Sequence, residues 1–360
     1  MFTRRDWIKG LPLMGAAAWG AQDRKAWAFE PRAGSQRLPV ERLRQWEALR
    51  YGMFIHFGMS TFVGEELPDG TAPASAYAPR DLDVDQWVSV ARDAGMRYAV
   101  LTAKHVAGHC LWPSKHTDYS VAKSEVPLDV CEAFVDACAK RGVLPGFYYC
   151  SWDNHHKFGS QTPSDLGWSE AMNRFPRPGE DVAPYTSSLY QTFQTAQLQE
   201  LLTQYGELAE VWVDIPGVLG RGYRTYLYER IGEWQPNAVV MMNSGIGDGS
   251  VEDYNVDYAW PSDLIAIERR LPPETGHAPW REIEGAWYYM PGELCDPIGE
   301  EWFFVDGDAP RSDETLLNLY RVSQERGVNF LLNVPPDRRG QIPSMHIEAL
   351  MRLRKQAGID

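Results

Sequence analysis

Cysteine is scarce in this sequence and shows no metal-binding pattern. There are five cysteines, and no two of them have the C-x-x-C spacing of a zinc cluster. The odd number also indicates no disulfide framework. Cys110 and Cys150 fall near the ends of predicted strands and could pair, although we favour the alternative that they are small buried side chains. The sequence therefore predicts no metal and no cofactor.

Positive charge is also scarce, and several enzyme motifs are absent. The 35 Lys and Arg residues against 49 Asp and Glu residues give a net charge of −14, and no long basic run follows the N-terminus. A surface this acidic repels phosphate backbones, which argues against nucleic acid as a partner. No G-x-G-x-x-G or P-loop follows a predicted strand, and no G-x-S-x-G turn occurs. These absences argue against a nucleotide-binding sheet and a serine nucleophile.

No apolar run is long enough to span a bilayer, which needs about 20 apolar residues. The first residues instead contain Arg4 and Arg5, a short apolar run LPLMGAAAWGA, and an A-x-A-like end at Ala28. This order is typical of an export signal, and TRRDWIK resembles the twin-arginine type, with a membrane-attached helix as the alternative. We predict a signal over residues 1–28 and a periplasmic or secreted domain over residues 29–360, without a membrane span once the signal is removed. The oligomeric state stays open.

The remaining chain alternates between strand-like and helix-like segments. The predicted strands cover residues 52–57, 98–103, 144–149, 210–214, 238–243, 254–260, 286–289 and 328–334. The predicted helices cover residues 39–50, 84–93, 129–141, 186–205, 224–234, 312–326 and 344–353. Apolar strands separated by helices favour a parallel sheet that is covered on both faces. About eight such strands over about 300 residues match a (β/α)₈ TIM barrel in size.

We therefore predict an α/β fold built as a single (β/α)₈-like catalytic barrel, with a doubly wound open sheet as the alternative. The long polar segment 159–184 follows the third predicted strand, and we interpret it as an insertion over one end of the barrel. Only the short helix 344–353 follows the last predicted strand, which predicts a domain without a C-terminal β-sandwich.

Polar and titratable side chains stand at the ends of five consecutive predicted strands. They are His56, Lys104 with His105, Tyr148 with Tyr149, Asp214, and Asn243 with Ser244. In a barrel the C-terminal ends of the strands converge on the face where catalysis occurs. A buried polar group costs about 1–3 kcal/mol unless it is hydrogen-bonded, so five such groups in the same relative place favour an active site. Taken singly, each histidine has a core role as its alternative, and Asp214 has a turn role.

The residue types at these strand ends suit carbohydrate chemistry. Glycoside hydrolysis needs two carboxyl groups across a bond, polar groups for sugar hydroxyls and aromatic faces for the ring, and the chain has 14 Trp and 17 Tyr to supply such faces. Metal-dependent hydrolysis lacks a ligand set, because His155 and His156 have no Asp, Glu or Cys at ligand spacing. We interpret this histidine pair as part of a solvated or cleft-lining loop. A carbohydrate is therefore the predicted partner.

Five segments, in chain order, carry a resemblance to a known family. They are RYGMFIHFG (50–58), YAVLTAKHVAGHCLWPSKHTDYSV (98–121), GVLPGFYYCSWD (142–153), ELLTQYGELAEVWVD (200–214) and GVNFLLNVPPDRRGQIP (327–343). The series resembles glycoside hydrolase family 29, the α-L-fucosidase family, and its sharpest match is the block K-H-x-x-G-x-x-L-W-P-S-K. The resemblance implies a (β/α)₈-like barrel and a retaining exo-glycosidase that acts on an α-L-fucoside or a related sugar.

The resemblance also implies roles for individual residues. Asp214 matches the nucleophile of a retaining mechanism, which would attack the anomeric carbon and form a glycosyl-enzyme. His56 and His105 match histidines that bind the sugar. Tyr149 and Trp212 match residues that line the same pocket.

The second carboxyl group is harder to assign, because its position varies within the family. Glu268 occupies a comparable place in DLIAIERRLPP and ranks first, followed by Glu284 and Glu293 in REIEGAWYYMPGE. A general acid needs a raised pKa, which apolar burial or the charge of the nucleophile would supply. Arg269 and Arg270 would oppose that rise if they pointed inward. The alternative for each glutamate is a surface carboxylate.

The sequence departs from the family pattern around the expected sugar pocket. Val106 stands where a second histidine is common, and Ala107 where an acidic residue often follows. A Glu-Trp-Tyr stretch matches residues 75–77, which read Ser-Ala-Tyr, and an arginine after the fifth strand has no counterpart near residues 243–244. His109 could replace part of what is missing. Lost partners should change sugar specificity, so a glycosidase for an α-L-galactose-like or modified sugar, or a non-catalytic carbohydrate-binding homologue, stays open.

Overall fold

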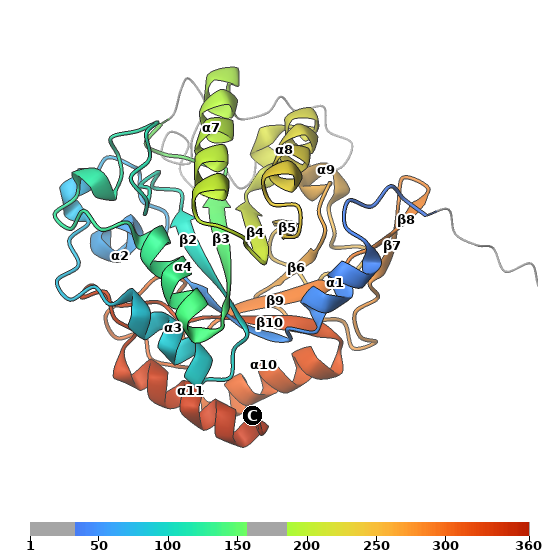
Figure 1. Cartoon of the computed structure of the whole chain (residues 1–360). Coiled ribbons are helices and arrows are strands. Elements are labelled where there is room, and N and C mark those ends of the chain that lie inside the picture. Colours follow the sequence, from blue (N-terminus) through green and yellow to red (C-terminus); the bar gives the residue numbers. More distant parts are fainter. Residues whose placement is uncertain (1–32, 157–185, 360) are drawn as a thin grey trace, which may run out of the picture.

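The computed structural model describes residues 33–156 and 186–359, which form an α/β barrel (Figure 1). The predicted export signal 1–28 and the predicted insertion 159–184 lie outside the described residues. Within the two described ranges, no helix combines the length and the apolar character that crossing a membrane requires.

Eight parallel strands form the barrel sheet. They are β1 (Tyr51–Ile55), β2 (Tyr98–Lys104), β3 (Leu144–Cys150), β4 (Glu210–Asp214), β5 (Val239–Met242), β6 (Ile265–Glu268), β9 (Gly292–Pro297) and β10 (Val328–Asn333). Neighbours follow the order β5-β4-β3-β2-β1-β10-β9-β6, and every neighbouring pair is parallel. Read around the ring, this is chain order, whereas a doubly wound sheet reverses its strand order. The predicted TIM-like barrel is confirmed.

The two ends of the sheet, β5 and β6, meet mainly through side chains rather than a strand ladder. The Asp263 carboxylate accepts the backbone N–H of Val240 at 2.8 Å, and the Ser262 hydroxyl accepts that of Met242 at 3.0 Å. Arg37 forms an ion pair with the same Asp263. These contacts satisfy backbone groups that a ladder would otherwise pair, so the barrel is nearly closed.

Helices cover the outside of the barrel. They are α1 (Val40–Glu47), α2 (Met59–Val63), α3 (Val84–Asp93), α4 (Val130–Arg141), α7 (Ser188–Gln204), α8 (Arg221–Trp234), α9 (Val256–Ala259), α10 (Asp313–Glu325) and α11 (Ser344–Ala357). Five of them start after a side chain that caps a free backbone N–H of the first turn, and these capping residues are Asp83, Asp129, Ser187, Asn255 and Ser312. Each cap contributes about 1 kcal/mol, which explains why these helix starts are sharp.

Three strand predictions need correction. Segment 254–260 was predicted as a strand but contains helix α9, which begins where the Asn255 side chain caps the N–H of Tyr258. Segment 286–289 is a strand, β8 (Ala286–Tyr289), but it pairs antiparallel with β7 (Trp280–Ile283) outside the barrel. The barrel strands β6 and β9 were not predicted, because β6 has only four residues and Glu293 and Asp296 interrupt the apolar pattern of β9.

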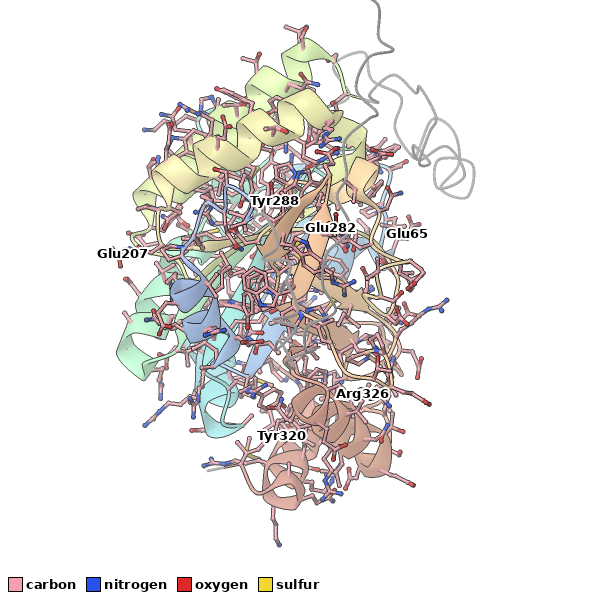
Figure 2. All side chains as sticks on the ribbon, turned by 90° about the vertical axis from the view of Figure 1, so that its right-hand side faces the viewer. Glu65, Glu207, Glu282, Tyr288, Tyr320 and Arg326 are labelled. Atoms are coloured by element: carbon pink, nitrogen blue, oxygen red, sulfur yellow. The ribbon has the colours of Figure 1, made fainter. Side chains whose placement is uncertain are left out.

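The β7–β8 hairpin covers the barrel beside the β5–β6 seam, where α9 provides only one helical turn (Figures 1 and 2). Figure 2 shows this side, with Glu282 and Tyr288 of the hairpin turned toward the viewer. The Tyr288 ring packs against Trp260, with 4.6 Å between ring centroids. The first described residues extend the hairpin, since the N–H of Gly34 donates to the carbonyl of Trp287 at 2.8 Å. The hairpin therefore takes the place of a longer outer helix.

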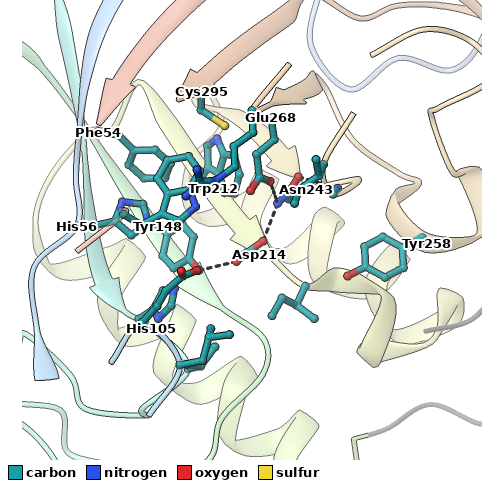
Figure 3. Close-up of a pocket in the computed structure, with 18 residues that line it drawn as sticks. Phe54, His56, His105, Tyr148, Trp212, Asp214, Asn243, Tyr258, Glu268 and Cys295 are labelled. Carbon is teal, nitrogen blue, oxygen red and sulfur yellow. Dashed lines mark hydrogen bonds between the residues drawn. The ribbon is translucent and has the colours of Figure 1, made fainter. Parts of the chain in front are cut away.

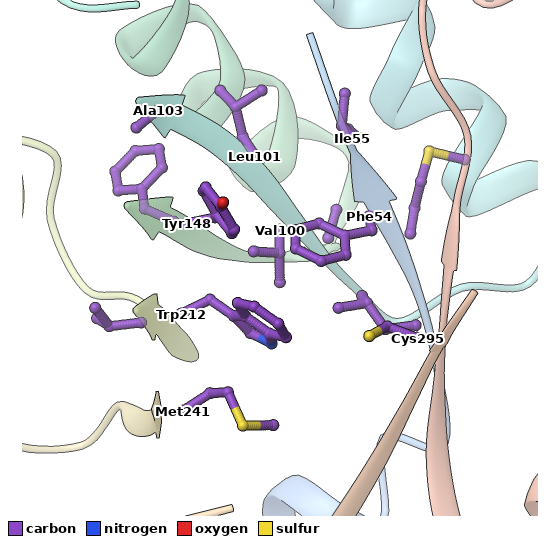
Figure 4. Close-up of a cluster of buried hydrophobic side chains, with 14 of the residues drawn as sticks. Phe54, Ile55, Val100, Leu101, Ala103, Tyr148, Trp212, Met241 and Cys295 are labelled. Atoms are coloured by element: carbon purple, nitrogen blue, oxygen red, sulfur yellow. The ribbon is translucent and has the colours of Figure 1, made fainter. Parts of the chain in front are cut away.

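Aromatic and aliphatic side chains fill the barrel interior (Figure 4). The Trp212 ring lies at the centre, 5.3 Å from Phe54 and 5.6 Å from Tyr148 between ring centroids. Each fully buried side chain of this size contributes roughly 1.5–3 kcal/mol. Trp46 of α1 lies 6.1 Å from Tyr98 and closes the amino-terminal end of the barrel. The packed interior leaves the opposite, carboxyl-terminal end available for a site.

Candidate active site

A pocket of about 260 Å³ opens at the carboxyl ends of the barrel strands (Figure 3). Five of the predicted site residues line it, and they are His56, His105, Trp212, Asp214 and Glu268. They come from the ends of β1, β2, β4 and β6, which lie far apart in the sequence. The barrel therefore gathers these strand ends on one face, as the sequence predicts.

Two carboxyl groups meet in this pocket through one amide (Figure 3). The Asn243 Nδ2 donates to Asp214 Oδ1 at 2.8 Å and to Glu268 Oε2 at 3.0 Å. Because both oxygens contact the same nitrogen, they are no more than about 6 Å apart. The Tyr148 hydroxyl donates to the other oxygen of Asp214, Oδ2, at 2.6 Å. Asp214 thus accepts a donor on each oxygen.

The surroundings separate the proton affinities of the two acids. Burial raises the pKa of Asp214, and the hydrogen bonds from Tyr148 and Asn243 oppose that rise. Burial, followed by the negative charge of Asp214, raises the pKa of Glu268 to about 7. Arg269 lines the pocket and acts in the opposite direction, but it does not cancel the rise. Near neutral pH, Glu268 can therefore hold a proton beside Asp214.

The two pocket histidines are neutral hydrogen-bonding groups. The Asn333 Nδ2 donates to the carbonyl of Trp302 at 2.7 Å, which leaves its Oδ1 to accept the Nδ1–H of His56 at 2.9 Å. This contact places the proton of His56 on Nδ1 and leaves Nε2 as an acceptor. Burial lowers the pKa of His56 well below its usual value and that of His105 to about 3. The His105 Nδ1 is buried without a partner among the described residues.

Aromatic rings pack against both histidines and against Tyr148, which donates to the Asp214 carboxylate. The Tyr148 ring stacks between His105 and Trp212, at centroid distances of 5.6 Å on both sides. Trp302 lies 5.1 Å from His56 and carries the guanidinium of Arg269 over its ring at 5.0 Å. Such stacking contributes about 0.5–1.5 kcal/mol per pair beyond burial. The result is a pocket with flat faces and neutral nitrogens beside the Asp214–Glu268 pair, which suits a sugar.

Comparison with known proteins identifies the family. Residues 71–355, which include Asp214 and Glu268, match the sequence model of a family described as α-L-fucosidase. This chain belongs to the α-L-fucosidase family. The predicted resemblance is thereby confirmed. α-L-fucosidase 1 from Arabidopsis thaliana is 31% identical over 334 residues, which cover 87% of this chain and 59% of that protein.

Further relatives agree with this assignment. A putative α-L-fucosidase 1 from Oryza sativa is 30% identical and covers 87% of this chain and 57% of its own length, so this chain spans less than two thirds of these plant proteins. A putative α-L-fucosidase from Bacteroides thetaiotaomicron superposes with a TM-score of 0.69 at 28% identity, over 90% of this chain and 68% of that one. A glycoside hydrolase 29 family member from a rumen bacterium gives 0.68 at 26% identity, over 91% and 58%.

Two residues that the family resemblance suggested for the pocket lie outside it. The side chains of β3 alternate, so Tyr148 faces the pocket and Tyr149 faces α7, where its hydroxyl donates to Gln197 at 2.8 Å. His109 follows a turn at Gly108, whose φ is 83°, and packs behind the pocket on Tyr77. Neither Tyr149 nor His109 therefore lines this pocket. Tyr77 belongs to the segment 75–77, which also lies away from the pocket wall.

The two other candidate acids, Glu284 and Glu293, also lie outside the pocket. Glu284 occupies the tight turn of the β7–β8 hairpin, with φ 53°, and forms an exposed ion pair with Arg221 at 2.7 Å. Glu293 lies deep in the barrel, where it accepts the Tyr98 hydroxyl at 2.6 Å and the Trp212 Nε1–H at 3.0 Å. Of the three ranked glutamates, Glu268 shares the pocket with Asp214.

A second polar cluster supports the loop that follows β3. Lys104 is buried and donates to Asp153 at 2.5 Å, with its Nζ 4.3 Å from the ring of Tyr149. Burial acts to raise the pKa of Asp153, but Lys104 and His156 hold it below its usual range. His155 stacks on Tyr119 and is exposed. The part of the chain that the structure describes contains no group of three or more His, Cys, Asp or Glu residues arranged to hold a metal.

Several pocket residues of this α-L-fucosidase-family chain were not predicted, among them Glu66, Leu67 and Trp302. Glu66 and Leu67 come from the loop after α2, and Trp302 follows β9. The sequence signal for Glu66 was weak, because it stands in an acidic pair on a loop. Trp302 follows β9, a strand that the sequence pattern does not predict. Arg269 is expected from the sequence only to oppose a rise in the pKa of Glu268, although it also lines the pocket. The loop order of a barrel, once its eight strands are known, would have indicated all of them.

Proposed function

We propose that this protein is an exo-acting, retaining glycosidase that hydrolyses an α-L-fucoside or a closely related sugar, with Asp214 as nucleophile and Glu268 as general acid and base. The observation that carries the proposal is the shared contact of both carboxyl groups with Asn243 Nδ2. Retaining enzymes have carboxyl groups about 5–5.5 Å apart, whereas inverting enzymes need about 6.5–9.5 Å to admit a water molecule. A separation within about 6 Å favours retention. It also argues against a binding protein that lacks a second acid.

In the first step, an Asp214 oxygen attacks the anomeric carbon while Glu268 gives its proton to the glycosidic oxygen. The bond from the anomeric carbon to the leaving group breaks, and the electron pair leaves with the protonated alcohol. The raised pKa of Glu268 keeps this proton available near neutral pH. The hydrogen bonds from Tyr148 and Asn243 favour the ionised form of Asp214 and orient it for the attack.

In the second step, Glu268 accepts a proton from water, and the oxygen of that water displaces Asp214 from the anomeric carbon. Asp214 is an uncharged ester at this stage, so the negative charge that raised the pKa of Glu268 is gone. The pKa of Glu268 therefore falls as it changes from acid to base. The same carboxyl group can serve both steps because its partner changes charge between them.

The neutral histidines and the pocket wall define the sugar class. The acceptor Nε2 of His56 suits a hydroxyl group of a sugar that carries no charge, and His105 adds a second neutral imidazole to the pocket wall. Val106 lines the pocket where a histidine is common in the family, so one hydroxyl partner is replaced by an aliphatic surface. This substitution favours a second candidate substrate, an α-L-galactoside or a modified sugar at the same site.

A glycoside panel with stereochemical analysis tests the proposal. The purified protein is incubated with aryl α-L-fucoside, α-L-galactoside and related glycosides, and ¹H NMR records the first anomer released. We expect turnover of the α-L-fucoside and release of the α-anomer. Faster turnover of another sugar would move the assignment to the second candidate. Release of the β-anomer would overturn the retaining mechanism, and no turnover of any glycoside would leave a carbohydrate-binding protein.

We also propose that the protein is exported through its twin-arginine signal. The support is the Arg4–Arg5 pair, the short apolar run and the A-x-A-like end of the signal. Replacing both arginines with lysine should retain the protein in the cytoplasmic fraction. Unchanged export of the Arg4→Lys/Arg5→Lys variant would exclude this route.

A further inference from the structure

Hydrogen bonds at both the nitrogen and the oxygen of the amide fix the orientation of the Asn243 side chain. Its Nδ2 faces the two carboxyl groups, and its Oδ1 accepts the backbone N–H of Gly245 at 2.9 Å. Reversing the amide would lose all three contacts. Gly245 has φ 94°, a left-handed conformation that glycine adopts without strain. The N-S-G sequence after β5 therefore locks the amide with its nitrogen toward the acids.

An asparagine suits this place for a chemical reason. Its amide nitrogen carries two hydrogens, so one atom can donate to Asp214 and Glu268 at the same time. A lysine or arginine would add a positive charge and favour ionisation of both acids, which would remove the general acid. An aspartate would add a third carboxylate. A neutral double donor holds the acids close together without forcing either one to ionise.

We propose that Asn243 is a positioning residue, whose amide nitrogen keeps the two carboxyl groups at the separation of a retaining site and stabilises whichever of them is ionised. This inference rests on the proposed function. Before the first step the negative charge is on Asp214, and after it Asp214 is an ester and Glu268 is the carboxylate. The charge passes between the two acceptors of one donor, so the stronger, charge-assisted hydrogen bond changes partner without any movement of Asn243.

Other groups also face the acids and must stay constant in a test. Around Glu268 these are Arg269 on the same strand end, Glu66 from the loop after α2, Cys295 on β9 and Tyr258 on α9. Around Asp214 the main donor besides Asn243 is the Tyr148 hydroxyl. A substitution at position 243 leaves all of these side chains in place, so a change in the titration of the acids reports on the shared amide.

The test compares Asn243→Ala and Asn243→Asp with the matched control Asn237→Ala. Asn237 is exposed and lies just before β5, at the opposite end from the pocket. We expect kcat of Asn243→Ala on the aryl α-L-fucoside to fall on the order of 10- to 100-fold, with KM changed by less than about threefold. The acidic and the alkaline limb of the kcat/KM pH profile should both move to higher pH in Asn243→Ala, because both acids lose a hydrogen-bond donor. The shift should be larger in Asn243→Asp, because that variant adds a carboxylate. The control should match wild type.

The result that overturns the inference is equally specific. Unchanged kcat and limbs in Asn243→Ala, or movement of one limb alone, would exclude a shared positioning role. Circular dichroism checks folding, and the nearly isosteric Asn243→Asp variant decides if Asn243→Ala does not fold. ¹³C NMR titration of the Glu268 carboxyl, assigned by its loss in Glu268→Gln, separates this inference from the proposed function. If no glycoside is turned over, the proposed function fails, but an upward shift of the Glu268 midpoint in Asn243→Ala still supports the positioning role, and an unchanged midpoint rejects it.

Discussion

Strand β4 carries two acids on its inward face, and their surroundings are opposite. Glu210 is its first residue and lies at the closed end of the barrel, while Asp214 is its last and lies at the pocket. Trp212 stands between them, with its ring in the pocket wall and its Nε1–H on Glu293. Each acid has a glutamate partner from another strand, Glu293 for Glu210 and Glu268 for Asp214. The barrel thus contains two carboxyl pairs along one strand.

The Glu210–Glu293 pair and the Asp214–Glu268 pair differ in the groups that lie between the two acids. At the closed end Glu210 and Glu293 share a hydrogen bond with each other, and their other donors are hydroxyl and indole groups in the packed interior. Burial raises the pKa of Glu293 to about 7 and that of Glu210 well above its usual value, the latter helped by the charge of Glu293. At the pocket, an amide separates the acids and a cavity adjoins them. In the proposed mechanism, two close carboxyl groups thus serve catalysis only where a substrate can reach them.

The largest expected difference is between Asp214→Ala and Glu210→Gln, two changes on the same face of β4. Loss of the proposed nucleophile should lower kcat on the aryl α-L-fucoside on the order of 10⁴-fold, and added azide should restore turnover by attacking the anomeric carbon in place of Asp214. Glu210→Gln should keep activity within a few-fold, because it leaves the pocket intact. Activity assays with and without azide measure both. Comparable losses in the two variants would contradict the functional division of the strand.

Glu268→Gln should show the next largest effect, and it should depend on the leaving group. The sugar alcohol that leaves a disaccharide substrate needs a proton, so hydrolysis of the disaccharide should fall roughly 10²- to 10⁴-fold. An acidic phenol leaves more easily without a proton, so the first step on an aryl glycoside should slow less. In wild type, activity on the disaccharide should decline as pH rises above about 7, because the protonated form of Glu268 is lost. The pH–rate profiles of both proteins measure this. An alkaline limb that persists in Glu268→Gln would assign the acid to another group.

The interior pair should control stability instead of rate. Acids whose folded-state pKa is raised bind protons that the unfolded chain releases, so stability is fullest below about pH 4.5 and falls as pH rises toward 7 and beyond. Glu210→Gln removes one of the two like charges and lets Glu293 ionise more easily. We expect its Tm to exceed that of wild type by a few °C at pH 8, with little difference at pH 5. Thermal unfolding across this pH range measures the effect, and a constant difference would disprove the charge origin.

The same polar residues explain which parts of the molecule the sequence could predict. Strands β1 to β5 are continuous apolar runs, and their predicted ends led to His56, His105 and Asp214. Strand β6 has only four residues and ends at Glu268, and β9 contains Glu293 and Asp296, so neither strand forms a long apolar run. Glu268 was ranked above Glu293 by family likeness, since only the ring of strands distinguishes the mouth from the interior.

A one-residue register was equally beyond the sequence. Tyr148 and Tyr149 are identical neighbours at the end of β3, and alternation along a strand places one inside and one outside without saying which. The pairing of Tyr148 with Trp212 across β3 and β4 decides it, because both then face the pocket. Side-chain direction in a barrel therefore follows from the neighbouring strand, which the local sequence does not contain.

Trp212→Phe should give the smallest effect and tests whether the two carboxyl pairs are linked through the strand between them. The phenyl ring keeps an aromatic face toward the sugar, but Glu293 loses the Nε1–H donor at 3.0 Å. We expect a loss of about 1–2 kcal/mol in the free energy of unfolding and a rise in KM of a few-fold, with the limbs of the pH profile unmoved. Denaturant unfolding and steady-state kinetics measure these quantities. Asp214 accepts hydrogen bonds from Tyr148 and Asn243 and not from Trp212. A shifted acidic limb would therefore mean that the Glu210–Glu293 pair influences the pKa of Asp214. In that case the two ends of β4 would not be independent.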